Sequence, residues 1–94
     1  MKFVMYPDKK SARTGEPTAI VIADDINAAF PKLRDAAIEW CNVNTFPVPD
    51  RIVLNGYKVT KKNPPCAYSL KAMCYNALKI EYTCFKVLTY TNAH

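Results

Sequence analysis

A helical repeat of apolar residues lies between segments rich in β-branched residues, and this order limits the folds open to the chain. The residues that share one helix face are Phe30, Leu33, Ala37, Trp40 and Cys41. The spacing predicts a helix over residues 27–41, with Asp24 and Asp25 offering capping oxygens. Pro31 fits only the first helical turn, so we expect the helix to begin no earlier than Asn27.

Segments with strand composition flank this helix on both sides. Residues 2–6 predict a short strand, and residues 18–23, which are apolar on both faces, predict a central strand. Residues 83–91 are rich in aromatic and β-branched side chains and predict a final strand. Residues 8–17 and 42–50 are polar or rich in proline, and we expect them to be loops.

Asn55-Gly56 lies between two β-rich runs and is the strongest hairpin signal in the chain, because both turn residues accept positive φ. A two-residue turn at this point fixes the register of strands over residues 51–54 and 57–60. One face of the hairpin is then apolar, and the other carries Arg51 and Lys58.

A second helix is predicted over residues 63–79. Asn63 can cap it, and Pro64 and Pro65 suit its first positions. The apolar residues that keep helical spacing beyond them are Leu70, Met73, Cys74, Ala77 and Leu78.

These elements predict one domain with a mixed architecture. With 94 residues the chain suits a single core, so we expect one α+β domain over residues 1–94. Its antiparallel sheet of four or five strands would carry two helices on one face, in ββαββαβ order, which is the ferredoxin-like order plus an extra N-terminal strand. If residues 2–6 pair with residues 18–23, the ferredoxin-like strand order fails, so the order of strands within the sheet stays open.

The sequence favours a cytoplasmic protein without a cofactor. Its apolar runs are far shorter than the roughly 20 residues that span a bilayer, and the first residues lack the apolar core of a signal peptide. The four cysteines form no Cys-x-x-Cys pair and the only histidine is His94, so we expect no metal site. Buried free thiols are expected instead.

The residue types that enzymes need are poorly represented. The two glycines stand far apart and cannot form a phosphate-binding loop, and neither serine lies in a Gly-x-Ser-x-Gly setting. We therefore expect a protein that is not an enzyme, and leave a nucleophilic Cys74 or Cys84 as the one catalytic alternative.

Positive charge concentrates in the second half of the chain. The formal net charge is +5, and residues 51–94 carry most of the excess of lysine and arginine over acidic residues. Basic surfaces attract phosphate backbones and carboxylate-rich protein surfaces. The candidate partner-binding or nucleic-acid-binding residues are Lys9, Lys10, Arg13, Arg51, Lys58, Lys61, Lys62, Lys86 and Tyr90.

Two functions fit these residues. The first is a small non-enzymatic cytosolic binding protein that docks through basic surfaces on an acidic protein partner, in the manner of phage or mobile-element accessory and inhibitor proteins that act on nucleic-acid-handling machinery. The second is a largely non-specific DNA- or RNA-binding module, in which Tyr90 or Tyr82 stacks on bases. RNA-recognition-motif domains use a ferredoxin-like sheet, but their aromatic signature has no counterpart here.

We expect no membrane partner and no small-molecule substrate. An exposed edge strand could join two copies of the chain in a homodimer.

Overall fold

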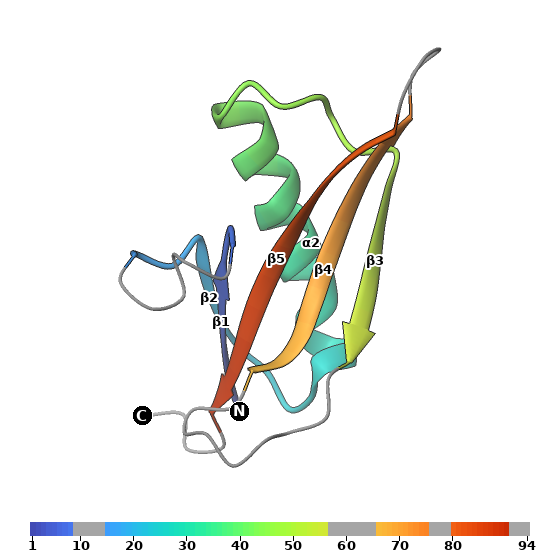
Figure 1. Cartoon of the computed structure of the whole chain (residues 1–94). Coiled ribbons are helices and arrows are strands. Elements are labelled where there is room, and N and C mark those ends of the chain that lie inside the picture. Colours follow the sequence, from blue (N-terminus) through green and yellow to red (C-terminus); the bar gives the residue numbers. More distant parts are fainter. Residues whose placement is uncertain (9–14, 57–65, 76–79, 91–94) are drawn as a thin grey trace.

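The computed structural model describes residues 1–8, 15–56, 66–75 and 80–90. Along these residues five strands and one helix follow one another (Figure 1). The elements are β1 (Lys2–Tyr6), β2 (Ala19–Ile22), α2 (Ile26–Val43), β3 (Arg51–Gly56), β4 (Cys66–Tyr75) and β5 (Ile80–Tyr90). The helix lies behind the sheet in Figure 1, so the chain forms a small α+β domain of two layers.

The five strands form one antiparallel sheet in the order β2-β1-β5-β4-β3. β5 occupies the centre and pairs with β1 on one side and with β4 on the other. The strands β2 and β3 are the two edges. A register shift between Cys66 and Tyr68 inserts a bulge into β4 near its start, which changes the alternation of side chains at that point.

The N-terminus of α2 is capped by Asp25. Its Oδ1 accepts a hydrogen bond of 2.8 Å from the backbone N–H of Ala28, and its carbonyl oxygen accepts one of 3.1 Å from Ala29. α2 begins at Ile26, so the expectations that it begins no earlier than Asn27 and that Pro31 falls in its first turn were wrong. Pro31 lies beyond the first turn, where it removes one backbone hydrogen bond from the helix. The helix continues through Pro31 because its buried face packs against the sheet.

The C-terminus of α2 ends in a Schellman motif. The N–H of Phe46 donates to the carbonyl oxygen of Cys41 at 2.9 Å, and the N–H of Thr45 donates to that of Asn42 at 3.3 Å. Thr45 has a φ of 61°, the left-handed conformation that this motif usually gives to glycine. The Phe46 ring stacks on Trp40 with 5.2 Å between centroids, which supplies the apolar contact that often accompanies the motif.

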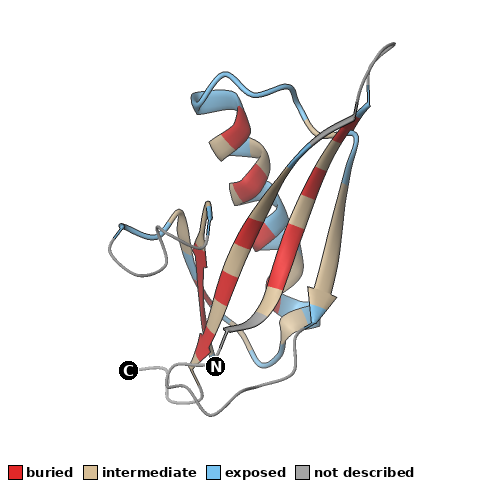
Figure 2. Ribbon diagram, viewed as in Figure 1, coloured by how far each residue is buried: buried red, intermediate tan, exposed pale blue. Residues whose placement is uncertain are grey.

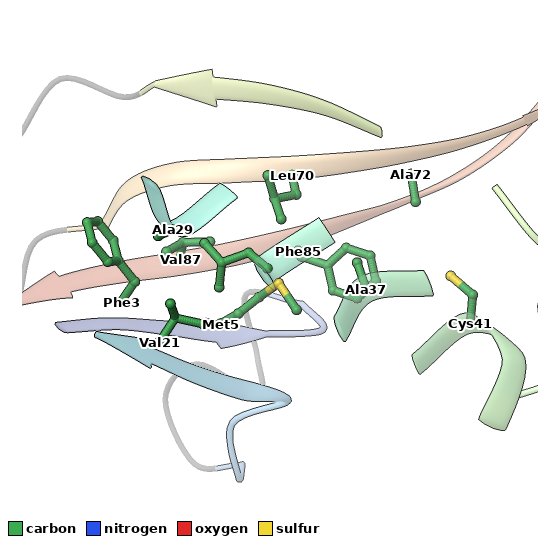
Figure 3. Close-up of a cluster of buried hydrophobic side chains, with 11 residues drawn as sticks. Phe3, Met5, Val21, Ala29, Ala37, Cys41, Leu70, Ala72, Phe85 and Val87 are labelled. Atoms are coloured by element: carbon green, nitrogen blue, oxygen red, sulfur yellow. The ribbon is translucent and has the colours of Figure 1, made fainter. Parts of the chain in front are cut away.

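The hydrophobic core lies between α2 and one face of the sheet. Figure 2 shows buried and partly exposed residues alternating along β5, as expected for a strand with one covered face. In β4 the alternation runs over residues 70–75, but Ser69, which points to the other side of the sheet, is also buried. Trp40 of the helix meets Phe85 edge-on at 5.4 Å between centroids. The buried core residues are Phe3, Met5, Val21, Ala29, Leu33, Ala37, Cys41, Leu70, Ala72, Phe85 and Val87, most of them labelled in Figure 3.

The predicted N-terminal strand, the first helix and the final strand are confirmed. Residues 2–6 form β1, the expected helix corresponds to α2, and the final strand corresponds to β5. Residues 19–22 also form a strand, but the expectation that it is central was wrong, because β2 is an edge strand with Ile20 and Ile22 exposed. The run is apolar on both faces although only one face is covered.

The predicted Asn55-Gly56 turn was wrong. Both residues belong to β3, in which Asn55 pairs with Ser69 and Gly56 with Tyr68. Gly56 does not adopt positive φ, which the turn would require. A Cβ at this position would lie 3.9 Å from the Tyr68 ring, an ordinary van der Waals distance, so the strand has room for a side chain here. Tyr57, Lys58 and the rest of the predicted second hairpin strand lie outside the described residues.

The predicted second helix was also wrong where the structure describes it, because residues 66–75 form β4. Leu70 and Cys74 are four residues apart, which fits a helix. Together with Ala72 they also occupy every second position, which fits a strand with one covered face. All three are buried on the side of the sheet that faces α2. Pairing with β3 and β5 on both sides decides in favour of the strand. The two-helix, ferredoxin-like arrangement is therefore not confirmed.

The strand order follows from the pairing of β1 with β2. This pairing occupies the edge of β2 that the last strand would need in a ferredoxin-like sheet, so β5 pairs with β1 instead. In the described part of the chain, no helix is both long enough and apolar enough to cross a membrane.

Candidate functional site

The side of the sheet opposite α2 is covered by no helix or strand among the described residues. We call it the open face. Because side chains alternate along a strand, its residues are those between the core positions. Phe85 contacts the helix residue Trp40, so Cys84 and Lys86 on either side of it belong to the open face.

The strand pairing assigns the rest of the open face. In antiparallel strands directly opposed residues point to the same side of the sheet, so each pair extends the assignment to the next strand. Tyr6 and Ser69 lie opposite Lys86. The other open-face residues fixed in this way include Lys2, Val4, Ile20, Ile22, Arg51, Val53, Lys71, Met73, Tyr82, Leu88 and Tyr90.

Four cations form a line across this face, with one on each of the strands β1, β5, β4 and β3. They are Lys2, Lys86, Lys71 and Arg51. Lys71 lies on the strand next to that of Lys86 and is displaced from it by two residues along the strand direction. Arg51 is related to Lys71 in the same way. Each of these steps is about 8 Å between Cα atoms, and the step from Lys86 to Lys2 is about 14 Å, as the spacing of strands and residues requires. We call these residues the cation line.

Tyrosines accompany the cation line. The Nζ of Lys2 lies 5.8 Å from the centroid of the Tyr90 ring, and the Nζ of Lys71 lies 5.9 Å from that of the Tyr82 ring. Tyr6 lies directly opposite Lys86. The Tyr82 side chain is 60% exposed, so much of its ring surface is open to a further stacking partner.

The tyrosine beside Lys2 adds no negative charge to the open face at neutral pH. Burial, and then the neighbouring Tyr6, raise the pKa of the Tyr90 hydroxyl, so this phenol is neutral and can donate a hydrogen bond. None of the described side chains assigned to this face is acidic. Described acidic residues are found instead on the helix and in the loops, among them Asp24, Asp25, Asp35 and Glu39.

The structure brings together three of the residues predicted from the sequence. Arg51, Lys86 and Tyr90 lie on the open face. The remaining candidates, Lys9, Lys10, Arg13, Lys58, Lys61 and Lys62, lie outside the described residues.

Sequence reasoning missed Lys2, Lys71 and Tyr6 as members of this surface. Lys71 lies outside the apolar repeat of the predicted second helix, and residues 66–75 of that segment form β4 instead. The signal that could have found it is the alternation from Ser69 to Cys74, in which every second residue is apolar. Lys2 and Tyr6 alternate with Phe3 and Met5 in the same manner, but they required the pairing of β1 with β5 to join the surface.

A cavity of about 330 Å³ lies at the C-terminal end of α2, and Tyr82 belongs to its lining. Cys41 and Cys74 line it together with Phe46 and Pro47. The Cys74 thiol donates a hydrogen bond of 3.3 Å to the carbonyl oxygen of Pro47. Burial, and then the neighbouring Cys74, raise the pKa of the Cys41 thiol, so Cys41 is protonated and weakly nucleophilic at neutral pH.

Comparisons of the chain with protein-family models, with curated proteins and with solved structures give no significant match. The function must therefore be argued from the chemistry of the open face.

Proposed function

We propose that the open face binds an acidic macromolecule, and that this partner is single-stranded nucleic acid. The observation that supports the proposal is the cation line with its accompanying tyrosines. A line of single charges on successive strands suits a linear polyanion, in which phosphates follow one another along a chain. Aromatic rings beside such a line provide stacking surfaces for bases without demanding a particular sequence.

The proposed activity is binding without catalysis, in the cytosol. Cys41 and Cys84 are free thiols, which is the common state of cysteine in a reducing compartment. The contacts on the open face would be to phosphates and base faces, so we expect little discrimination between sequences.

The experiment that tests this proposal is a titration of labelled single-stranded oligonucleotides, followed by fluorescence anisotropy over a range of salt concentrations. If the four residues of the cation line contact phosphates, the slope of log K against log salt should be about −3. A duplex of the same length should bind more weakly, because its bases are not free to stack on tyrosine.

Two double variants separate a local effect from the change in net charge. Arg51→Glu/Lys71→Glu alters the cation line, and Arg34→Glu/Lys32→Glu makes the same chemical change on the exposed side of α2. The sheet pair should weaken binding by at least about tenfold, because two phosphate contacts are lost, while the helix pair should weaken it much less. Equal losses in the two variants, or no binding of single strands at low salt, would reject the proposal.

A Tyr82→Ala variant tests stacking separately from charge. We expect about a tenfold loss of affinity for single strands, since stacking of one base contributes about 1–3 kcal/mol. The slope against salt should stay the same, because no charge has changed.

An acidic protein surface is the second candidate partner. It is favoured by the half-buried apolar residues Val53, Met73 and Leu88, which lie between the cations and resemble the apolar centre of a protein interface. In this case the protein would act as an accessory or inhibitor protein of the kind that mobile elements encode.

A capture experiment with and without nuclease treatment of the lysate decides between the two candidate partners. An acidic protein that is retained after nuclease treatment, and lost with the Arg51→Glu/Lys71→Glu variant, would replace nucleic acid as the partner.

A further inference from the structure

The edge strand β2 has a sequence that reads the same in both directions. Residues 19–23 are Ala-Ile-Val-Ile-Ala, so the segment is a palindrome centred on Val21. An antiparallel pair of two identical strands has a twofold axis, and a palindrome centred on that axis places each residue opposite its own kind. This property distinguishes a second copy of the chain from other strands that could pair with β2.

The backbone of β2 offers hydrogen-bonding groups at its outer edge. Ala23 exchanges hydrogen bonds with Met1, of 3.0 Å through its N–H and 2.9 Å through its carbonyl oxygen. In an antiparallel pair such residues alternate with residues whose N–H and C=O point away from the partner. Val21 and Ala19 therefore bond to β1, whereas the N–H and C=O groups of Ile20 and Ile22 point outward.

The side chains at this edge are apolar and exposed. Ile20 is 55% exposed and Ile22 is 64% exposed, and both lie on the open face. Edge strands of soluble proteins are commonly protected by charged residues or proline. Both edge strands follow a proline by two residues, Pro17 before β2 and Pro49 before β3, but β2 itself has no charged residue, whereas β3 begins with the exposed Arg51.

We propose that two copies of the chain pair antiparallel through β2, around a twofold axis at Val21. Ile20 of one copy then lies opposite Ile22 of the other, and these two pairs form the hydrogen bonds that the outer edge offers. Val21 lies opposite Val21, and Ala19 lies opposite Ala23. The two sheets join into one, so the isoleucines of both copies come together on the same side.

The charge of the segment favours this pairing, but its length limits the affinity. Residues 19–23 carry no charge, so two copies can pair here although each chain has a formal net charge of +5. An interface of five residues on each side is smaller than the roughly 1,200–2,000 Å² that stable complexes bury. We therefore expect a dimer that forms reversibly as the protein concentration rises, rather than a permanent one.

Amide hydrogen exchange measured by NMR at several protein concentrations tests the proposal, in the absence of nucleic acid. In dilute solution the amides of Ile20 and Ile22 should exchange fast, whereas those of Val21 and Ala23 are protected by β1. As the protein concentration rises, the Ile20 and Ile22 amides should become protected in parallel with an increase in mass measured by sedimentation. A monomer at every concentration, or a dimer in which these two amides stay unprotected, would overturn the proposal.

Paired variants provide an independent measurement. Ile20→Lys/Ile22→Lys places charges at the edge. Val48→Lys/Tyr75→Lys adds the same charge at side chains that are 62% and 47% exposed, in the loop before β3 and at the end of β4, and neither of these elements neighbours β2 in the sheet. The edge variant should raise the dissociation constant of the dimer by at least about tenfold, because like charges meet across the axis, and the control should leave it unchanged. Ile22→Pro removes one outward N–H without removing a bond to β1, and it should have the same effect as the edge variant. A dimer that persists in both edge variants, while far-UV circular dichroism shows the native fold, would reject the interface.

Discussion

At the scale of single residues, both ends of α2 depend on one side chain or one backbone conformation. Asp25 satisfies a backbone N–H at the start of the helix, and Thr45 adopts a left-handed conformation just after its end. The sequence predicted the cap, since two aspartates precede the apolar repeat. It did not predict the C-terminal motif, because threonine is a poor substitute for the glycine that normally marks it.

Replacing Asp25 by alanine should destabilise the protein by about 1 kcal/mol, since the hydrogen bond to the Ala28 N–H is lost. Chemical denaturation measures the change. Asp24→Ala removes the same charge from the neighbouring residue, which is not the N-cap of the helix, and should have a smaller effect. If the two variants lost the same stability, the charge of the loop would matter rather than the cap.

Replacing Thr45 by glycine should stabilise the protein by about 1 kcal/mol, because glycine adopts a φ of 61° without the steric cost that a β-branched residue incurs. The Thr45 hydroxyl donates a hydrogen bond to the carbonyl oxygen of Asn44, and its loss subtracts from the gain. A rise in the midpoint of thermal unfolding checks this expectation. Thr45→Ala, which removes the hydroxyl but keeps the steric cost, should not produce the rise.

At the scale of elements, the segment that forms β4 shows where prediction from sequence stops. A repeat of two and a helical repeat both fit its apolar residues, and only the pairing with two other strands decides between them. For β1, α2 and β5 one pattern dominated, and those predictions are confirmed. The candidate site was affected by the same ambiguity, because Lys71 reaches the open face only when its segment is a strand.

Neighbouring substitutions in β4 should differ sharply in their effect on stability. Ala72 is 1% exposed and faces the core, so Ala72→Glu should destabilise the protein by more than about 3 kcal/mol, since an unpaired charge would be buried. Lys71→Glu, on the open face, should change stability by less than about 1 kcal/mol. Urea denaturation of the two variants checks the alternation. Similar losses for both would contradict the assignment of faces on which the cation line depends.

At the scale of the whole molecule, the described residues divide their charge between two sides. The open face carries the cation line and no described acidic side chain, whereas acidic residues gather on the helix and in the loops. No composition value could predict this division, because it depends on which strands are neighbours. The net charge of +5 from the sequence indicated an acidic partner, and the sheet order indicates the surface that such a partner would meet.

Salt should stabilise the protein without any ligand. Like charges on the open face repel one another, and screening reduces this repulsion. Between low and moderate sodium chloride concentrations we expect the free energy of unfolding to rise by about 0.5–1 kcal/mol, which corresponds to about 2–8 °C in Tm for a domain of this size. The Arg51→Gln/Lys71→Gln variant should show a smaller rise. A Tm that falls with added salt in the native protein would contradict the expectation.

The position of β5 at the centre of the sheet also determines when the fold can form. Lys2 pairs with Tyr90, so the first strand finds its second neighbour only after nearly all the described chain has been synthesised. Until β5 leaves the ribosome, the hairpin of β1 and β2 can pack only against α2, which follows it in the chain. Contacts between residues so distant in sequence slow folding. The native sheet is therefore completed after translation of β5, and the edge of β1 that β5 will occupy stays unpaired throughout that interval.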